Sequence, residues 1–308
     1  MNKRFILGVL CAGIVILFMG YRAVAPKPPK IQGITIIASF SVLQDLTENI
    51  VKDLPDFHVS SLVPLMTDPH TYQPRPRDST RLQQADVVIM NGWEFEGWID
   101  KLITASGFQG LKIIATDGLK PRKMVDQDKD MIDPHAWHSI PHAVGYVTTI
   151  ANHLMVRYPQ HKDQIKKNLA SYRGVLMALD QELTTLFQEI PKNNRFVVTT
   201  HDAFWYFGNQ YALNFLSPIG VDTEQEPAAR SIKNLIDMVR RHNIKALFVE
   251  NLSNKKLIEN IAQETGLNIS GTLYADGLGD QHSKAATYVG MMRHNAYLIY
   301  EKLRGPKP

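Results

Sequence analysis

Residues 161–190 read HKDQIKKNLASYRGVLMALDQELTTLFQEI and predict one long helix. Its apolar side chains recur at spacings of three and four, which places them on one helical face: Ile165, Leu169, Tyr172, Val175, Leu176, Leu179, Leu183, Leu186, Phe187 and Ile190. At 1.5 Å per residue the helix spans roughly 45 Å, more than one small lobe needs. We therefore expect residues 159–190 to link an N-terminal lobe over 31–158 to a C-terminal lobe over 191–308.

Strand and helix patterns alternate on both sides of this helix. The expected strands are Ile34–Ser39, Ser60–Leu65, Ala85–Asn91, Leu111–Ala115, Arg195–Thr200, Asn214–Ile219, Ala246–Glu250 and Asn268–Tyr274. The expected helices are Val42–Val51, Asp78–Gln84, Trp93–Ala105, 141–157, Ala203–Tyr211, Ala228–His242, Asn254–Glu264 and Ala285–Leu303, and a polar loop is expected over Asp117–Asp130. Repeated strand–helix units predict parallel sheets with helices on both faces. The fold class is therefore α/β, with two lobes joined by one long helix.

The chain's charge argues against a nucleic-acid partner. The 308 residues are 44% hydrophobic and 21% charged, which is typical of a soluble globular protein, and their net charge is +4. Residues 1–30 contain five basic residues and no acid, so the rest of the chain carries −1. No basic stripe is evident, and we expect no binding to nucleic acid.

The N-terminal residues resemble an export signal. Lys3 and Arg4 precede an apolar run over 5–20, and Ala23-Val24-Ala25 resembles a cleavage site, although Pro26 follows it. We expect residues 1–30 to be a signal peptide or an uncleaved membrane anchor with a tether, and the protein to be periplasmic or otherwise extracytoplasmic. The single cysteine, Cys11, lies in this leader, so the mature domain has neither a disulfide nor a thiolate ligand.

One tripeptide occurs twice, as Asp68-Pro69-His70 and Asp133-Pro134-His135. Proline fixes its own φ and restricts the residue before it, so each histidine is oriented in advance. His201 directly follows a predicted strand, and Asp276 follows the last one. Ligands of open α/β sheets bind at the carboxyl ends of the strands, so these side chains are expected to meet in the cleft between the lobes. Three imidazoles and one carboxylate suit Zn²⁺ and are compatible with Mn²⁺ or Fe²⁺.

Each of these residues also has a purely structural interpretation. Asp68 and Asp133 can bond to the backbone of a turn, with the following histidine merely capping it, and Asp276 can be a turn aspartate. His201 can pack against Trp205 at the end of its strand. The coincidence of four such residues at matching strand ends favours the metal site.

Two further residues close to these positions keep open roles. His138 lies three residues after His135, and the remaining histidines are expected to be structural or solvated. Glu250 ends a strand that faces the cleft, so it is either a buried hydrogen-bonding acid with a structural role, or a carboxylate that supports a ligand or binds the ion itself.

Eight segments of the chain resemble the solute-binding proteins of zinc and manganese ABC importers, the periplasmic solute-binding protein family 9. They are DPHTYQPRPRD (68–78), NGWEFEGWIDKLI (91–103), DPHAWHSI (133–140), THDAFWYFGNQYAL (200–213), EPAARSIKNLID (226–237), LFVENL (247–252), LYADGLGD (273–280) and TYVGMMRHN (287–295). The resemblance runs in the family's order from about residue 34 to 295. It implies that His70, His135, His201 and Asp276 are the metal ligands. It also implies that the linking helix is rigid.

The resemblance further implies a receptor rather than an enzyme. Such a receptor captures a divalent metal outside the cytoplasmic membrane and delivers it to the membrane permease of a metal ABC importer, and we expect it to be a monomer. Residues 117–133 lack the histidine-rich loop of many zinc-specific members, whereas His201 stands where several manganese-preferring members have glutamate. The nitrogen-rich donor set favours Zn²⁺ over Mn²⁺ or Fe²⁺ in the Irving–Williams order.

Other functions are weighed against this one. A zinc-dependent hydrolase usually keeps an open coordination position, and no His-Glu-x-x-His motif is present. A surface adhesin with the same fold is a second alternative. A nucleotide-binding enzyme is a third, although the chain has neither a dinucleotide fingerprint nor a P-loop.

Overall fold

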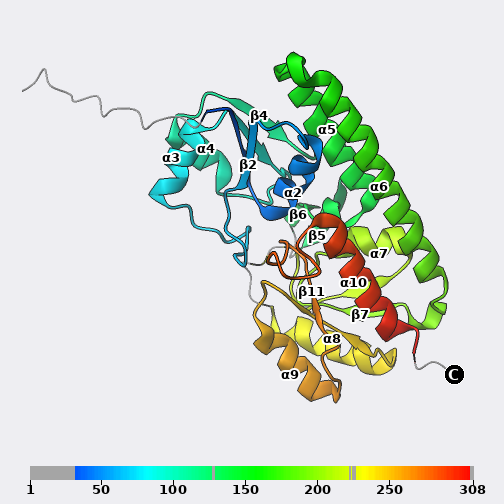
Figure 1. Cartoon of the computed structure of the whole chain (residues 1–308). Helices are drawn as coiled ribbons and strands as arrows, with labels where there is room; N and C mark the ends of the chain where they lie inside the picture. The colour runs from blue at the N-terminus through cyan, green and yellow to red at the C-terminus, as the bar shows by residue number, and fades with distance from the viewer. Residues whose placement is uncertain (1–31, 127–128, 222, 224–226, 306–308) are drawn as a thin grey trace, which may run out of the picture. The chain divides into compact units, whose positions relative to one another are not determined.

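A parallel four-stranded sheet forms the centre of the N-terminal lobe. The structure is a computed structural model that describes residues 32–126, 129–221, 223 and 227–305, so the predicted leader and tether over 1–30 lie outside it. The strands are β1 (Ile34–Ala38), β2 (Phe57–Ser61), β3 (Val87–Met90) and β4 (Leu111–Ile114), in the order β2-β1-β3-β4. The helices of this lobe are α2 (Ser41–Ile50), α3 (Pro76–Gln84), α4 (Ile99–Ser106) and α5 (Ile140–Arg157). The predicted α/β architecture of this half is confirmed (Figure 1).

The C-terminal lobe contains two parallel ladders instead of one continuous sheet. The first is β8-β7-β9, and the second pairs β10 with β11. Their bounds are β7 (Phe196–Val198), β8 (Asn214–Leu216), β9 (Ala246–Leu247), β10 (Val249–Glu250) and β11 (Thr272–Leu273). The break falls at Phe248, whose N–H bonds Val198 O at 2.9 Å, whereas the next N–H bonds Gly271 O at 3.1 Å. The predicted strand Ala246–Glu250 thus changes its neighbour halfway along.

The remaining helices cover these ladders and end the chain. They are α7 (Trp205–Tyr211), α8 (Ala229–Arg241), α9 (Lys255–Thr265) and α10 (Tyr288–Leu303), with 3₁₀ turns η1 (Ala136–His138), η2 (Pro159–His161) and η3 (Lys192–Asn194). In Figure 1, α8 and α9 lie together in yellow and orange, on the side of their lobe away from the N-terminal sheet.

The predicted long helix is α6 (Lys162–Gln188), 27 residues in length. Its buried face carries the expected apolar positions, Ile165, Leu169, Tyr172, Leu176, Leu179, Leu183 and Phe187. Val175 was expected on this face but is 47% exposed. α6 packs against α2 and α5 in one lobe and against α7 and α10 in the other, so a single buried cluster runs through both lobes (Figure 1).

A hairpin replaces much of the predicted loop over 117–130. Strands β5 (Arg122–Asp126) and β6 (Lys129–Asp133) pair antiparallel, with Arg122 opposite Asp133. The hairpin is rich in charged residues and lacks apolar alternation, so the strand pattern was not visible. Several boundaries also differ from the prediction. β2 begins at Phe57, α3 at Pro76, α4 only at Ile99, β11 only at Thr272 and α10 at Tyr288.

The residues before α4 cannot continue a helix because Gly92, Trp93 and Glu94 have φ values of +91°, +54° and +62°. Asp78 lies in the first turn of α3 and accepts a hydrogen bond from the backbone N–H of Arg75 at 2.7 Å. It therefore stabilises the start of the helix as a capping-box partner.

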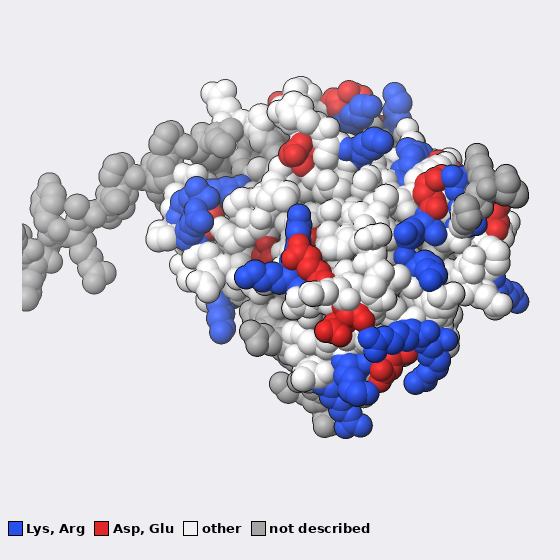
Figure 2. Space-filling view, turned by 90° about the horizontal axis from the view of Figure 1, so that it is seen from below, with Lys and Arg blue, Asp and Glu red and all other residues white. Residues whose placement is uncertain are grey.

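Among the described residues, every helix is too short or too polar to cross a membrane. On the face shown in Figure 2, basic side chains are interspersed with acidic ones and do not merge into a single stripe. The charge on this face is therefore locally balanced.

Candidate metal site

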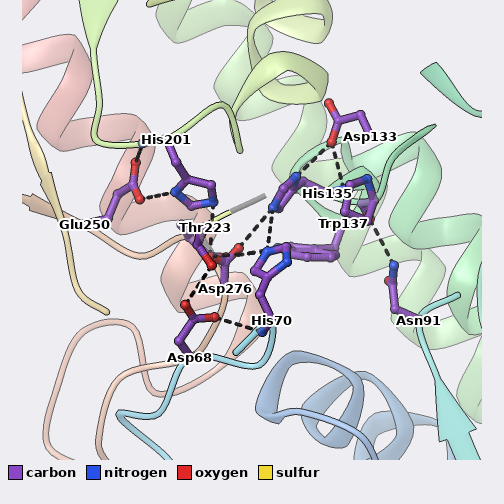
Figure 3. A network of polar contacts seen from close by, with 12 residues as sticks. Asp68, His70, Asn91, Asp133, His135, Trp137, His201, Thr223, Glu250 and Asp276 are labelled. Atoms are coloured by element: carbon purple, nitrogen blue, oxygen red, sulfur yellow. Dashed lines mark hydrogen bonds and ion pairs between the residues drawn. The ribbon is translucent and has the colours of Figure 1, made fainter. Parts of the chain in front are cut away.

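Four side chains from both lobes meet at one point. One ligand atom each from His70, His135, His201 and Asp276 lies within 4.8 Å of the other three (Figure 3). Nε2 of His70 is 3.2 Å from Nε2 of His135, and Oδ1 of Asp276 is 3.4 Å from the latter. Oδ2 of Asp276 is 3.2 Å from Nε2 of His201 and 3.9 Å from Nε2 of His70.

These separations match those around a small cation. With metal–nitrogen distances of 2.0–2.1 Å, ligand atoms at tetrahedral corners lie about 3.4 Å apart. Nε2 of His201 and Oδ1 of Asp276 are buried and have no hydrogen-bond partner in the described structure. A buried polar atom without a partner is costly, and a bound cation would satisfy both atoms. The four side chains thus offer three imidazole nitrogens and one carboxylate at separations that a small cation could bridge.

Both Asp-Pro-His loops use their aspartate to shape the turn. Oδ1 of Asp68 accepts the backbone N–H of His70 at 2.8 Å, and Oδ1 of Asp133 accepts that of His135 at 3.0 Å. Asp133 also accepts a hydrogen bond from Nδ1 of His135 at 2.8 Å. This bond fixes the tautomer and leaves Nε2 free to coordinate. The turn interpretation and the ligand interpretation of these aspartates are thus compatible.

The second Asp-Pro-His loop is held by a buried polar network. The side-chain amide of Asn91 donates to Pro134 O at 3.0 Å, and Tyr146 donates to Asn91 Oδ1 at 2.6 Å. Glu96 accepts from Ser39 Oγ and from the backbone N–H groups of Asn91 at 2.7 Å and its neighbour at 3.3 Å. Burial raises the pKa of Glu96 to about 7. This network fixes the loop that carries His135.

In the C-terminal lobe, His201 depends on Glu250. The carboxylate of Glu250 accepts the backbone N–H groups of Thr200 and His201 at 2.9 and 3.0 Å. It also accepts Nδ1 of His201 and the Ser253 hydroxyl. Glu250 points its oxygens at the back of the His201 ring and not at the other ligands (Figure 3). It is therefore the buried acid that supports a candidate ligand, which is one of the roles that the sequence left open.

Both lobes hold the loop that carries Asp276. In the C-terminal lobe, Asn251 bonds the backbone of Ala275 and Gly277 at 3.3 Å each. Trp137 donates from Nε1 to Ala275 O at 3.1 Å, and the backbone N–H of Leu278 donates to Ser41 Oγ at 2.9 Å. Both partners flank Asp276 closely in sequence. Asp276 therefore stays at the lobe boundary, 3% exposed.

The protonation states differ between the ligands. Burial lowers the pKa of His70 to about 3, so this imidazole is neutral at neutral pH. Burial would also lower the pKa of His201, but the charges of Glu250 and Asp276 raise it well above its ordinary value. Burial disfavours ionised Asp276, yet the histidines, His201 first, hold the pKa of this carboxyl far below normal. Asp276 is therefore negatively charged and ready to bind a cation.

His138 does not join the four residues. It is fully buried, its ring lies tilted against that of Phe204 at a centroid distance of 4.5 Å, and neither ring nitrogen has a hydrogen-bond partner in the described structure. Burial lowers its pKa to about 3, so it is a neutral packing residue.

Hollows on two sides lead to the site. One is lined by residues that include His70, Phe95 and Pro134, and the other by residues that include Asp68, Thr200 and His201. Sequence reasoning missed Arg122, which contacts the aspartate behind His135. In the sequence, Arg122 is only one charged residue of the polar segment 117–133, and nothing there indicates its partners.

The family of the chain follows from these features and from comparison with known proteins. The family model described as ZnuA, zinc-uptake complex component A, periplasmic, matches residues 36–302. The chain belongs to this family, whose members are substrate-binding components of metal ABC importers, and the resemblance seen in its motifs is confirmed.

Curated relatives and solved structures agree. The manganese-binding lipoprotein MntA of Bacillus subtilis is 33% identical over 279 residues, covering 89% of this chain and 90% of its own. The metal ABC transporter substrate-binding lipoprotein SsaB of Streptococcus sanguinis is 31% identical over 275 residues, covering 87% and 88%. A manganese-bound periplasmic metal-binding protein from Candidatus Liberibacter asiaticus has a TM-score of 0.79 at 27% identity, covering 88% and 99%. The zinc-binding protein TroA of Treponema pallidum, at 24% identity and a TM-score of 0.82 with the same coverage, shows the same fold.

Proposed function

We propose that the protein is an extracytoplasmic receptor that captures a divalent transition metal and delivers it to the permease of an ABC importer. His70, His135, His201 and Asp276 are the proposed ligands. The observation that carries this proposal is the meeting of three imidazole nitrogens and one carboxylate, drawn from both lobes, within 4.8 Å. The family supports the transport role, because its members serve importers and are not enzymes.

Each lobe contributes to capture in a defined way. The neutral imidazole of His70 and the charged carboxylate of Asp276 are prepared to bind a cation before it arrives. Binding neutralises the charge of Asp276 and connects the lobes through the ion. The protein acts as a monomer outside the cytoplasmic membrane, where the relatives named as lipoproteins support its location.

The preferred metal is proposed to be Zn²⁺. Three nitrogen donors and one oxygen at near-tetrahedral spacing suit Zn²⁺, whereas Mn²⁺ favours oxygen-rich sites with more ligands. Several relatives are named as manganese-binding, and this favours Mn²⁺ as the second candidate. Competition of Zn²⁺ and Mn²⁺ for the purified protein, with metal analysis of protein isolated from its native compartment, distinguishes them. Manganese as the dominant native metal would overturn the zinc assignment.

The ligand set is tested by His135→Ala, because His135 is buried and central to the four atoms. Calorimetry should show a loss of affinity of about 1,000-fold or more, because a ligand is removed from a four-ligand site. The matched control is His242→Ala, which removes an exposed histidine that stacks on Phe196 and is not one of the four candidate ligands. Circular dichroism verifies that both variants are folded. Unchanged affinity in folded His135→Ala protein would overturn the assignment.

A further inference from the structure

Arg122 lies at the start of the β5–β6 hairpin and joins the segments that carry His135 and His201. Its Nη1 atom donates to Oδ2 of Asp133 at 2.9 Å and to Oδ2 of Asp202 at 3.0 Å. Asp133 precedes His135 by two residues, and Asp202 directly follows His201. A single guanidinium nitrogen therefore connects a ligand segment of the N-terminal lobe with one of the C-terminal lobe.

The guanidinium is held in place from several directions. In the hairpin, Arg122 stands opposite Asp133, so the ion pair is also a cross-strand pair. The backbone N–H of Arg122 donates to the Tyr206 hydroxyl at 2.8 Å, and that hydroxyl donates to Asp133 O at 3.1 Å. The guanidinium carbon lies 4.8 Å from the centroid of the Trp205 ring. Trp205 and Tyr206 begin α7, so the hairpin is attached to the helix that follows His201.

Charge makes this contact specific to arginine. The side chain of Asp133 is fully buried, and that of Asp202 is 22% exposed. Without a cation between them, the two carboxylates would repel each other across the lobe boundary. Arginine stays charged and offers a planar fork of donors that also stacks on an aromatic ring, whereas lysine provides only a compact ammonium.

We propose that Arg122 is a positioning residue of the metal site, which holds His135 and His201 together and thereby slows the escape of the bound ion. It acts through Asp133, whose other oxygen orients the imidazole of His135. Loss of Arg122 frees Asp133 to turn and allows the His201 segment to move away. This inference rests on the proposed function as a metal receptor.

The test measures metal release from the full mature protein. Arg122→Gln is loaded with Zn²⁺ and mixed with excess chelator in a stopped-flow instrument. The dissociation rate should rise about 10-fold, the lower end of what residues behind the ligands contribute to metal affinity. The control is Arg293→Gln, which breaks the ion pair with Glu182 between α10 and α6, away from the site. Arg122→Lys provides the same measurement if the glutamine variant does not fold.

A double-mutant cycle separates positioning from general destabilisation. Asp202→Asn should raise the dissociation rate, and the double variant Arg122→Gln with Asp202→Asn should release Zn²⁺ no faster than Arg122→Gln alone. Additive effects, or release from folded Arg122→Gln at the wild-type rate, would overturn the role. His135→Ala tells the two failures apart. If it loses Zn²⁺ binding while Arg122→Gln behaves as wild type, only this inference fails, whereas unchanged binding in His135→Ala overturns the ligand set on which both proposals rest.

Discussion

In the N-terminal lobe, each candidate histidine is oriented by a carboxylate two residues before it, whereas in the C-terminal lobe His201 relies on Glu250, 49 residues further along the chain. The first arrangement is local, because proline and aspartate shape the loop that carries the ligand. The second requires two strands to be correctly placed before the ligand is oriented. In the proposed metal site, the histidines of one lobe are thus oriented by local turns, and the histidine of the other lobe is oriented by a contact between distant strands.

The two Asp-Pro-His loops also differ from each other. One oxygen of Asp133 accepts hydrogen bonds from both the backbone and the ring of His135, and the second oxygen accepts one from Arg122. Asp68 bonds only the backbone of His70, and its second oxygen accepts the hydroxyl of Thr223 at 2.9 Å. Identical tripeptides therefore hold their histidines by different numbers of hydrogen bonds. The second oxygen of each aspartate bonds a residue that belongs to the C-terminal lobe or contacts it.

Among the residues that orient the candidate ligands, the largest effect is expected from Glu250→Gln. Glutamine keeps the shape of the side chain but loses the negative charge that holds Nδ1 of His201. The affinity for Zn²⁺ should therefore fall about 100-fold. Chelator competition measures it. The control is Asp237→Asn, which removes an exposed carboxylate on α8 that pairs with Lys233. Wild-type affinity in Glu250→Gln would mean that the C-terminal ligand, like the N-terminal ones, is prepared by its own loop.

The pH dependence of binding compares the ligands directly. His70 has a pKa of about 3 and is neutral, whereas His201, with its raised pKa, carries a proton in the metal-free protein at neutral pH. A cation must displace that proton, so binding should release about one proton, and affinity should rise about 10-fold per pH unit below the raised pKa. Calorimetry in buffers of different ionisation enthalpy counts the protons. No proton release at neutral pH would contradict this difference between the lobes.

A smaller effect is expected from Thr223→Val, which keeps the shape of the side chain but removes the hydroxyl that bonds Asp68. The net contribution of such a bond is about 1 kcal/mol, so the affinity for Zn²⁺ should fall about fivefold. The same chelator competition measures this change, with Thr185→Val on the exposed surface of α6 as the control. A loss as large as that of Glu250→Gln would show that the two lobes depend equally on distant partners.

The smallest effect on the site is expected from Leu183→Ala in α6. Leu183 is fully buried, so its truncation should lower the free energy of unfolding by about 3 kcal/mol. The affinity for Zn²⁺ should stay unchanged, because the ligands are held by their own networks. Thermal unfolding and chelator competition are measured in parallel, with Met177→Ala, which is 62% exposed, as the control. A parallel loss of affinity would show that the linking helix contributes to the site.

The sequence predicted the fold well where its apolar pattern is strong. The spacing in α6 and the runs of β1 and β3 identify their elements because a buried face must be apolar on a regular period. The hairpin β5–β6 was missed because its strands are charged and are held by pairing and by Arg122. The exchange of neighbours at Phe248 could not be seen, since every residue from Ala246 to Glu250 suits a strand.

The four candidate ligands, which the structure brings together, could be selected from the sequence because strand ends and stiff loops are visible there. Arg122 could not be identified in this way, because its partners Asp133 and Asp202 lie 11 and 80 residues away along the chain. Its role depends on the fold bringing them together. Glu250 was recognised as a candidate but its role stayed open for the same reason. Residue types identify what could bind a metal, whereas only the fold shows which groups aim the ligands.

By its position in the chain, Asp276 belongs to the C-terminal lobe, and Asn251 of that lobe bonds the backbone of Ala275 and Gly277 on either side of it at 3.3 Å each. The other lobe anchors the same loop. Trp137 and Ser41 bond residues on either side of Asp276, and Asp45 accepts the N–H of Tyr288 at 3.0 Å further along. The loop of the proposed carboxylate ligand therefore ties the two lobes together. Any opening of the cleft must first break hydrogen bonds on one side of Asp276 or the other.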